Sequence, residues 1–330
     1  MKLLKTVLFV VTLASTFAVQ AQERTLKFAT QNPKGHPLVT GMERFAEIVA
    51  AKSGGKIKVN LFTGGVLGSD QANVSALQGG TLEMVVLNSG ILASQVKQFG
   101  IYDFPFMFAN PREADSVVDG PFGKKMHQRL EEKGIVGLAY WELGFRNITN
   151  SKHPINKVED IAGLKLRVIP NAINVDWVKA LDANPTPLPF PELYAALDQK
   201  AIDGQENPNS VINANKFYEV QKYVALTNHQ YNPQSLIFSK KIWDTLSNNE
   251  RKILGDAAIE AGKFQRQVSR DEANGALENL KKNGMQVTEL APAELAKFRQ
   301  KMKPVIEKHG AVVGEDVVKE IQAELTKIRK

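Results

Sequence analysis

Apolar positions in the N-terminal part of the chain follow two alternating periods. Residues 25–30 are predicted to form a strand, residues 56–62 show the two-residue alternation of a half-buried strand, and residues 82–87 form an apolar run typical of a central strand. Between them, residues 37–52 carry apolar side chains at helical spacing and end at a Gly-Gly pair. A shorter helix is predicted over residues 69–80, from a Ser-Asp N-cap to a second Gly-Gly pair. Strands that alternate with helices predict βαβ units and a mostly parallel sheet.

The same alternation returns after about residue 145. One helical pattern there is unusually long: it begins at a Ser-x-x-Glu capping box at 247–250, runs to Asn283-Gly284, and is long enough to span two lobes. The other predicted strands are 164–168, 202–205, 223–227, 236–238 and 285–290, and the other predicted helices are 171–181, 191–199, 292–309 and 314–328.

A chain of 330 residues exceeds a typical single domain, so two lobes are expected. The apolar run 135–140 and the polar segment 141–150 lie near the proposed boundary, and together they predict a strand that crosses between lobes. We expect lobe I to contain residues 22–144 with about 233–272 returning to it. Lobe II is expected to contain residues 145–232 with about 273–330 joining it.

The N-terminus has the pattern of a secretory signal peptide. Lys2 and Lys5 precede the apolar or small-residue run 6–19, and small residues at Val19 and Ala21 mark a cleavage site. We therefore predict a signal peptide over residues 1–21, cleavage after Ala21 and a periplasmic mature chain. No later stretch approaches the roughly 20 apolar residues of a transmembrane helix.

Charge and motif content narrow the classes of function. The formal charge is +7, or +5 once Lys2 and Lys5 leave with the signal peptide, and the cations are spread without the stripe expected of a nucleic-acid-binding protein. The sequence has no cysteine, no glycine-rich nucleotide loop, no G-x-S-x-G and no H-E-x-x-H, and its five histidines show no ligand spacing. We therefore predict no catalytic residues, no metal and no cofactor.

Three polar positions favour binding of an anion. A predicted strand ends near Arg167 and a helix begins at Asn171, which is where open α/β sheets bind ligands and where helix N–H groups attract anions. Arg167 could grip a carboxylate with two parallel hydrogen bonds, or it could form a surface ion pair. Arg146 on the crossing strand could face the cleft or solvent. Asn207, extended before a proline, could contact a ligand or stabilise a turn.

Four segments together resemble the solute receptors of tripartite ATP-independent periplasmic (TRAP) transporters, the DctP-type family. They are Gly-Leu-Lys-Leu-Arg-Val at 163–168, Asn-Pro-Thr-Pro-Leu-Pro-Phe at 184–190 with Glu-Leu-Tyr-Ala-Ala-Leu at 192–197, Asp-Gly-Gln-Glu-Asn-Pro at 203–208, and Lys-Phe-Tyr-Glu-Val-Gln-Lys-Tyr at 216–223. The resemblance covers essentially the whole mature chain. It implies the α/β periplasmic-binding-protein (Venus flytrap) fold, with two lobes joined by crossing strands and a long helix and with the ligand enclosed at the hinge.

The resemblance also implies roles for four residues. Arg167 matches the family arginine that pairs bidentately with the ligand carboxylate, and Arg146 matches a second arginine beside it. Asn207 is expected to orient the carboxylate, and Phe190 is expected to pack against the ligand.

Neutral amide side chains at three positions predict which groups the rest of the ligand carries, apart from its carboxylate. In the sialic-acid branch an acidic residue and an arginine hold the sugar tail, whereas the aligned positions here are Asn88 and Ile91, which argues against sialic acid. Gln31, Asn88 and Gln234 would suit hydroxyl groups better than a second carboxylate. Glu142 could accept from a ligand hydroxyl or be a structural partner of Arg146.

These observations predict a monomeric binding protein that captures a hydroxylated monocarboxylate, such as a sugar acid or hydroxy acid, and delivers it to a TRAP membrane permease. A C4-dicarboxylate or uronate ligand would use the same mechanism with a different tail pocket. A periplasmic enzyme acting on such an acid, or a partner of a signalling receptor, are the alternatives from other classes.

Overall fold

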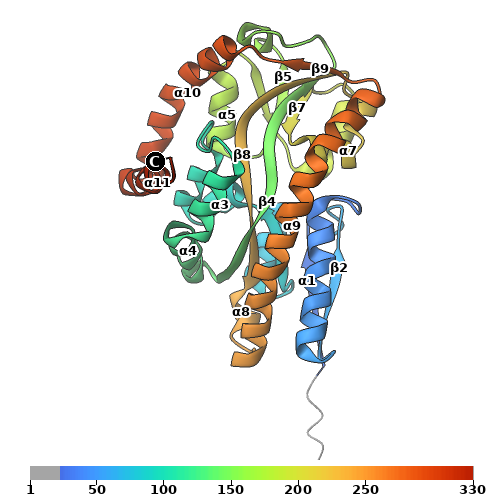
Figure 1. Ribbon diagram of the computed structural model, residues 1–330, viewed down its shortest axis with the longest axis vertical. Helices are drawn as coiled ribbons and strands as arrows, with labels where there is room; N and C mark the ends of the chain where they lie inside the picture. The colour runs from blue at the N-terminus through green and yellow to red at the C-terminus, as the bar shows by residue number, and fades with distance from the viewer. Residues whose placement is uncertain (1–22, 330) are drawn as a thin grey trace, which may run out of the picture.

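The computed structural model describes residues 23–329, and lobe I has the predicted alternation of strands and helices (Figure 1). Its elements are β1 (Arg24–Ala29), α1 (Pro37–Ser53), β2 (Ile57–Phe62), α2 (Asp70–Gly79) and β3 (Met84–Asn88). Local chemistry sets the ends of α2: Ser69 accepts a hydrogen bond from the backbone N–H of Ala72, and Gly80 ends the helix at φ 76°. The three strands pair in parallel, as predicted.

The segment between β3 and the crossing strand is helical, which the hydrophobic pattern did not indicate. It consists of the 3₁₀ helices η1 (Ser89–Ser94), η2 (Lys97–Asp103) and η3 (Glu131–Lys133) and the helices α3 (Pro111–Asp119) and α4 (Pro121–Gln128). Each of these pieces is short, so none shows enough turns for a 3.6-residue period to be recognised.

Lobe II repeats the strand and helix alternation, with shifted boundaries. Its elements are η4 (Val158–Ile161), β5 (Lys165–Val168), α5 (Ala172–Lys179), β6 (Asn184–Pro187), η5 (Phe190–Glu192), α6 (Leu193–Asp198), β7 (Gly204–Asn207), α7 (Asn209–Ala214) and η6 (Phe217–Glu219). The predicted strand 202–205 is wrong by two residues, because β7 runs to Asn207 in order to pair with the crossing strand β4. The helix predicted over 191–199 begins as a 3₁₀ turn, and strand β6 was not predicted.

Two long antiparallel strands, β4 (Ile135–Asn150) and β8 (Tyr223–Ser239), cross between the lobes (Figure 1). They join the lobes into one sheet of order β2-β1-β3-β8-β4-β7-β5-β6, with β9 (Gln286–Glu289) paired to β8. The prediction of separate strands over 223–227 and 236–238 is wrong. The polar stretch between them continues the strand because it is buried beside β4, where side-chain hydrogen bonds replace apolar packing.

The long helix α9 (Asn248–Lys282) runs along both lobes, as predicted from its capping signals (Figure 1). Ser247 and Glu250 form the expected capping box. Around its middle α9 packs closely on α1 and β4. Gly41 and Gly262 allow this close approach, because a methyl group on Gly262 would lie 2.8 Å from the Trp141 ring. Farther along, Leu280 belongs to the core of lobe II.

A short helix, α8 (Lys240–Trp243), precedes α9. After β9 the chain ends with the helices α10 (Pro292–Val313) and α11 (Glu315–Ile328). Helix α10 packs against α5 and η2, and α11 packs against α3 and α4. The C-terminal helices therefore contact elements on both sides of the proposed boundary. The residue limits of the two lobes remain a prediction.

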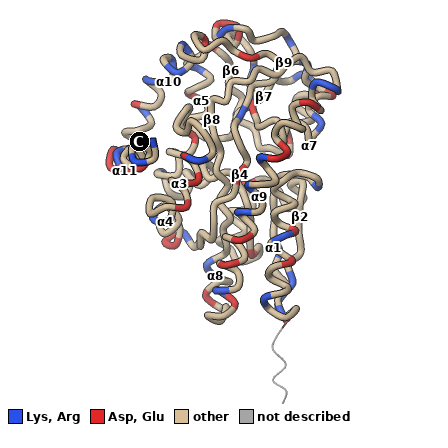
Figure 2. Tube along the Cα trace, in the orientation of Figure 1, with Lys and Arg blue, Asp and Glu red and all other residues tan. Residues whose placement is uncertain are grey.

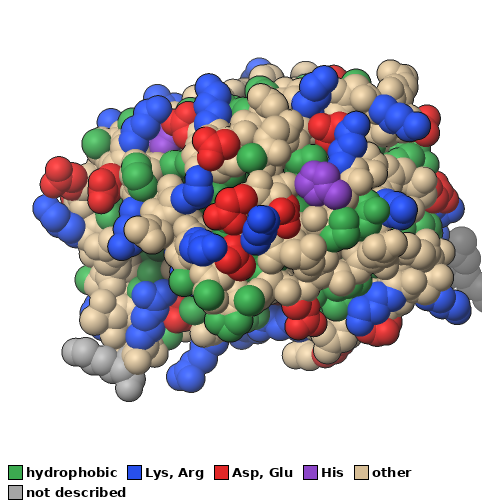
Figure 3. Space-filling model, turned by 90° about the horizontal axis from the view of Figure 1, so that it is seen from above, with side chains coloured by type: hydrophobic (Ala, Val, Ile, Leu, Met, Phe, Trp, Pro, Cys, Tyr) green, Lys and Arg blue, Asp and Glu red, His purple; other side chains and the backbone are tan. Residues whose placement is uncertain are grey.

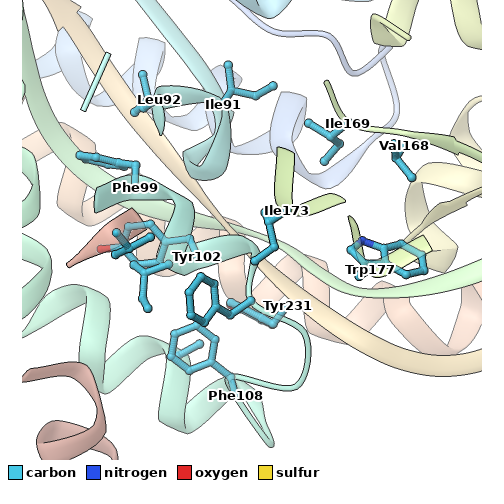
Figure 4. Close-up of a cluster of buried hydrophobic side chains, with 14 of the residues drawn as sticks. Ile91, Leu92, Phe99, Tyr102, Phe108, Val168, Ile169, Ile173, Trp177 and Tyr231 are labelled. Carbon is cyan, nitrogen blue, oxygen red and sulfur yellow. The ribbon is translucent and has the colours of Figure 1, made fainter. Parts of the chain in front are cut away.

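The largest core continues from one lobe into the other (Figure 4). Side chains of η1 and η2 meet those of β5 and α5, with Tyr231 of the crossing strand β8 beside them. The side chains labelled in that view are Ile91, Leu92, Phe99, Tyr102, Phe108, Val168, Ile169, Ile173, Trp177 and Tyr231. Two further clusters lie under α1 and α9 and around α6 and α7.

Charged side chains of both signs are distributed over both lobes (Figure 2), and the face in Figure 3 shows Lys and Arg interspersed with Asp and Glu. Within residues 23–329, no helix combines the length and apolarity needed to cross a bilayer. The predicted signal peptide and its cleavage after Ala21 lie outside the described residues.

Candidate ligand-binding site

All seven residues predicted to contact a ligand line one cavity between the lobes. The carboxyl ends of β1, β3, β5 and β7 and the middle of the crossing strands surround the cavity, as expected for an open α/β sheet. The seven residues are Gln31, Asn88, Arg146, Arg167, Phe190, Asn207 and Gln234.

Arg167, near the end of β5, is the cation with the most unused hydrogen-bonding capacity in the site. Its side chain is 2% exposed, and its Nε donates to the backbone oxygen of Leu188 at 2.8 Å. This contact orients the guanidinium while its two Nη groups make no hydrogen bond within residues 23–329. Burial lowers the pKa of Arg167 to about 10, so the group stays positive at neutral pH. A buried cation with two parallel donors is matched to a carboxylate.

Arg146, on the crossing strand β4, is largely committed to protein partners. Its Nε and Nη2 bind both carboxylate oxygens of Glu206, and Nη2 also donates to the Glu206 backbone oxygen. Its Nη1 donates to Oδ1 of Asn232 at 2.7 Å. Four of the five N–H groups of the guanidinium are thus used, which leaves one donor on Nη1.

Glu206 and His229 set the charge around Arg146. Burial raises the pKa of Glu206, but the positive charge of Arg146 and the nearby His229 outweigh it and hold that pKa at about 2. His229 Nε2 lies 3.3 Å from Glu206 Oε2, and burial lowers the pKa of His229. At neutral pH the pair Arg146–Glu206 is therefore close to electrically neutral, whereas Arg167 forms no salt bridge with a carboxylate of residues 23–329.

Asn207 and Phe190 complete the wall around Arg167. Asn207, the last residue of β7, is 2% exposed, and its Nδ2 donates to Oε1 of Gln205 at 2.5 Å, which fixes the amide. The Phe190 ring lies 5.7 Å from Cζ of Arg167, within the range of a cation–π contact.

The lobe I side of the cavity is lined by neutral amides. Gln31 donates from Nε2 to the Gly68 backbone oxygen at 2.9 Å, and its Oε1 is buried without a partner among the described residues. The Nε2 of Gln234 is likewise buried without a partner. Asn88 pairs opposite Gln234 in the β3–β8 ladder and accepts a hydrogen bond from Gly90 N at 3.0 Å. Gln31, Asn88 and Gln234 thus offer both donors and acceptors, and none of the three carries a formal charge.

Asp70 is a cavity residue that the sequence prediction missed. It is the first residue of α2, and its Oδ1 is enclosed without a hydrogen-bond partner in the described part of the chain. Burial raises the pKa of Asp70 to about 7, although the charge of Arg167 and the amide of Gln31 lower it. Its place at a helix start, in the connection between β2 and α2, was the available signal, since ligands of such sheets bind beyond the carboxyl ends of strands.

Further lining residues were also missed. Five apolar residues give the cavity apolar walls: Leu143, Ile169, Pro170, Pro189 and Val211. They carry no chemical signal in the sequence, because apolar residues at strand ends resemble core residues. The remaining lining residues are Thr30, Asn32, Gln71, Val86, Leu87 and Ile91.

Glu142 contacts neither Arg146 nor the cavity, so both suggested roles are wrong. Its carboxylate binds Arg270 of α9 at 2.6 Å. The pairing of β4 with β8 is irregular between Glu142 and Gly144, where Gly144 has φ 114°. Such an irregularity breaks the two-residue alternation, so residues four apart no longer share a face.

Two α/β lobes joined by crossing strands, with a buried cationic cavity between them, define a periplasmic solute-binding protein. Residues 28–311 match the family described as bacterial extracellular solute-binding protein, family 7. The chain belongs to this DctP family of TRAP receptors, as the motifs predicted.

Three solved structures illustrate the relationship. A TRAP periplasmic solute-binding protein from Ochrobactrum anthropi, with its C-terminus bound in the ligand-binding pocket, is 55% identical, with 94% of this chain and 97% of that chain covered and a TM-score of 0.83. A sugar acid binding protein from Advenella mimigardefordensis in complex with galactonate is 42% identical (93% and 99% covered, TM-score 0.91). A receptor from Polaromonas sp. JS666 bound to D-erythronate is 37% identical (91% and 99% covered, TM-score 0.88).

Proposed function

We propose that this protein captures a hydroxylated monocarboxylate, such as an aldonate of about four to six carbons, and delivers it to a TRAP permease. Arg167 carries the proposal. Its guanidinium is buried, positively charged and oriented by Leu188, and both of its Nη groups lack a protein partner within residues 23–329. A ligand carboxylate would supply the missing negative charge and accept two parallel hydrogen bonds.

The other head-group contacts follow from this placement. The remaining Nη1 donor of Arg146 and the free part of the Asn207 amide border the same cavity. Each can donate one hydrogen bond to a carboxylate oxygen. Phe190 beside Arg167 limits access of water, which strengthens the ion pair although desolvation offsets part of the gain.

The tail pocket favours hydroxyl groups. Arg146 and Arg167 are the cations among the cavity-lining residues, so a second carboxylate would have no cation of its own. Gln31 and Gln234 instead offer an unpartnered acceptor and an unpartnered donor, which a hydroxyl can satisfy simultaneously. The similar proteins bound to galactonate and D-erythronate, both hydroxylated monocarboxylates, support this assignment.

Binding is proposed to act through closure, without a chemical reaction. The ligand would contact lobe II through Arg167 and lobe I through Gln31, so occupancy favours the closed arrangement of the lobes. The mature protein would act as a periplasmic monomer after removal of residues 1–21. The closed form would then dock on the permease.

Thermal unfolding with a panel of acids tests the proposal. A ligand that binds only the folded state raises the unfolding midpoint by mass action. We expect C4–C6 aldonates to raise the midpoint more than dicarboxylates or uronates, and the uncharged alditols to have no effect. A response to alditols but to no acid would contradict the roles of Arg167 and Arg146.

The fate of the ligand separates a receptor from an enzyme. After prolonged incubation the acid is recovered from the complex and analysed by mass spectrometry and NMR. We expect both measurements to show the original compound. Conversion of the acid would replace the proposal with a catalytic one.

A further inference from the structure

A fully buried carboxylate lies behind the cavity wall. Asp103, at the end of η2, has no exposed surface, and Asn171 and Asn174 donate to its Oδ2, the latter at 3.2 Å. Its Oδ1 accepts from Nδ2 of Asn232 at 3.2 Å and from Nδ2 of Asn88 at 3.5 Å. All four side chains are neutral amides that present N–H groups, so the position is built for an acceptor-only group.

The four amides come from different parts of the molecule. Asn88 ends β3 in lobe I, Asn171 and Asn174 belong to the start of α5 in lobe II, and Asn232 lies on the crossing strand β8. The site is also sterically fixed, because a methyl group on Gly90 would lie 2.0 Å from Asp103 Oδ2. Asp103 therefore occupies a defined position where the lobes and the crossing strand meet.

Asn232 connects Asp103 to the cavity. Its Nδ2 faces Asp103, and its Oδ1 accepts from Nη1 of Arg146. A carboxylate on one side admits only the N–H end of this amide, so the oxygen must face Arg146. A neutral amide at position 103 could present either end. Asn232 could then turn its own N–H groups towards a cation that needs an acceptor.

The position of the last free donor of Arg146 depends on this arrangement. The guanidinium is a rigid plane held by Glu206 through Nε and Nη2 and by Asn232 through one hydrogen of Nη1, so these contacts together place the second hydrogen of Nη1. An Asn232 that turned its N–H groups towards Arg146 would repel Nη1 and displace this edge of the guanidinium.

We propose that Asp103 is a positioning residue of the carboxylate site, which fixes the amide of Asn232 so that Arg146 presents its remaining donor to the ligand. Asp103 touches no ligand in this scheme, since it does not line the cavity. The proposal rests on the assignment of Arg146 to carboxylate binding made above.

Calorimetric titration with galactonate as the probe tests the link. Asp103→Asn preserves the volume and is expected to weaken binding about tenfold or more, as loss of an oriented charge-assisted hydrogen bond would. Asn232→Ala should weaken it similarly, and the double variant should be no weaker than Asn232→Ala alone, because the two residues act in series. Wild-type affinity in Asp103→Asn, or effects that multiply in the double variant, would overturn the proposal.

A second measurement requires no ligand. In ¹⁵N-labelled protein, the guanidinium signals of Arg146, assigned through Arg146→Lys, should shift or broaden in Asp103→Asn while those of Arg167 stay in place. Asp244→Asn removes an exposed carboxylate that pairs with Lys240, and it should change neither set. Unmoved Arg146 signals refute the positioning role whatever the ligand is. Moved signals in a protein that binds no acid refute the proposed function instead.

Discussion

At the scale of single residues, the two arginines of the cavity differ in what surrounds them. Arg146 is paired with Glu206 and Asn232, whereas Arg167 contacts one backbone oxygen and the Phe190 ring. The sequence indicated both arginines through strand ends and motifs. It could not show which one is already neutralised, because Glu206 meets Arg146 across sixty positions of the chain. Charge balance in a cleft is a property of the folded chain.

Replacement of Arg167 tests the head-group contact. Arg167→Ala should cost about 2 to 5 kcal/mol in binding, because the ligand carboxylate would be buried unpaired. Arg167→Lys should also weaken binding, since a point charge cannot form two parallel hydrogen bonds. Titration calorimetry measures both. Arg44→Ala, on the exposed side of α1, should bind as the wild type does. An Arg167→Ala variant of undiminished affinity would remove Arg167 from the site.

Asp70 predicts a pH dependence of binding. Its pKa is raised to about 7 by burial, with Arg167 lowering it. A ligand carboxylate beside Arg167 adds negative charge and should raise this pKa further, so binding takes up a proton. Affinity should therefore be highest below about pH 7 and fall as the pH rises above it.

Calorimetry in buffers of different ionisation enthalpy detects the proton uptake directly. Asp70→Asn should bind with an affinity that no longer changes between pH 6 and pH 8. A wild-type protein with the same affinity and no proton uptake over this range would show that Asp70 titrates independently of the ligand.

At the scale of elements, α9 crosses closely over β4, and this crossing predicts opposite effects on stability when two glycines of α9 are replaced by alanine. Gly262 faces the buried Trp141, whose Nε1 donates to the Ala258 backbone oxygen at 3.0 Å and cannot easily move. Gly262→Ala should destabilise the fold by about 1 to 3 kcal/mol through overpacking. Gly255, in the same helix, has open space around its Cα. Gly255→Ala should stabilise by about 0.5 to 1 kcal/mol.

Chemical denaturation measures the change in the free energy of unfolding for each of the two variants. Helix propensity alone would make both substitutions stabilising. Equal behaviour of Gly262→Ala and Gly255→Ala would therefore contradict the close contact between α9 and Trp141.

Elements with local signals were predictable, and elements set by distant partners were not. Ser69, Gly80 and the capping box at Ser247 mark helix ends through their own neighbours. Strand β8 was divided because its polar middle is buried only by contact with β4. Glu142 was misplaced because a two-residue period cannot reveal an irregular ladder. The seven predicted cavity residues come together because strand ends converge in this topology.

At the scale of the whole molecule, the lobes share a core. The main apolar cluster joins Leu92 and Phe99 on one side to Val168 and Trp177 on the other. Neither lobe can expose its part without disrupting the other. We expect the mature chain to unfold in a single calorimetric transition, with equal calorimetric and van't Hoff enthalpies. Two separable transitions, one per lobe, would contradict a shared core.

Strand β6 is an edge strand of the sheet, and its sequence affects whether a strand of another molecule can pair with this edge. The backbone N–H groups of Asn184 and Leu188 point inward to β5, where they bind the oxygens of Leu164 and Val168. The intervening outward positions are Pro185 and Pro187, which have no N–H group. Another strand therefore finds no donors along this edge. A receptor secreted into a crowded compartment thus carries, in two prolines, protection against edge-to-edge aggregation.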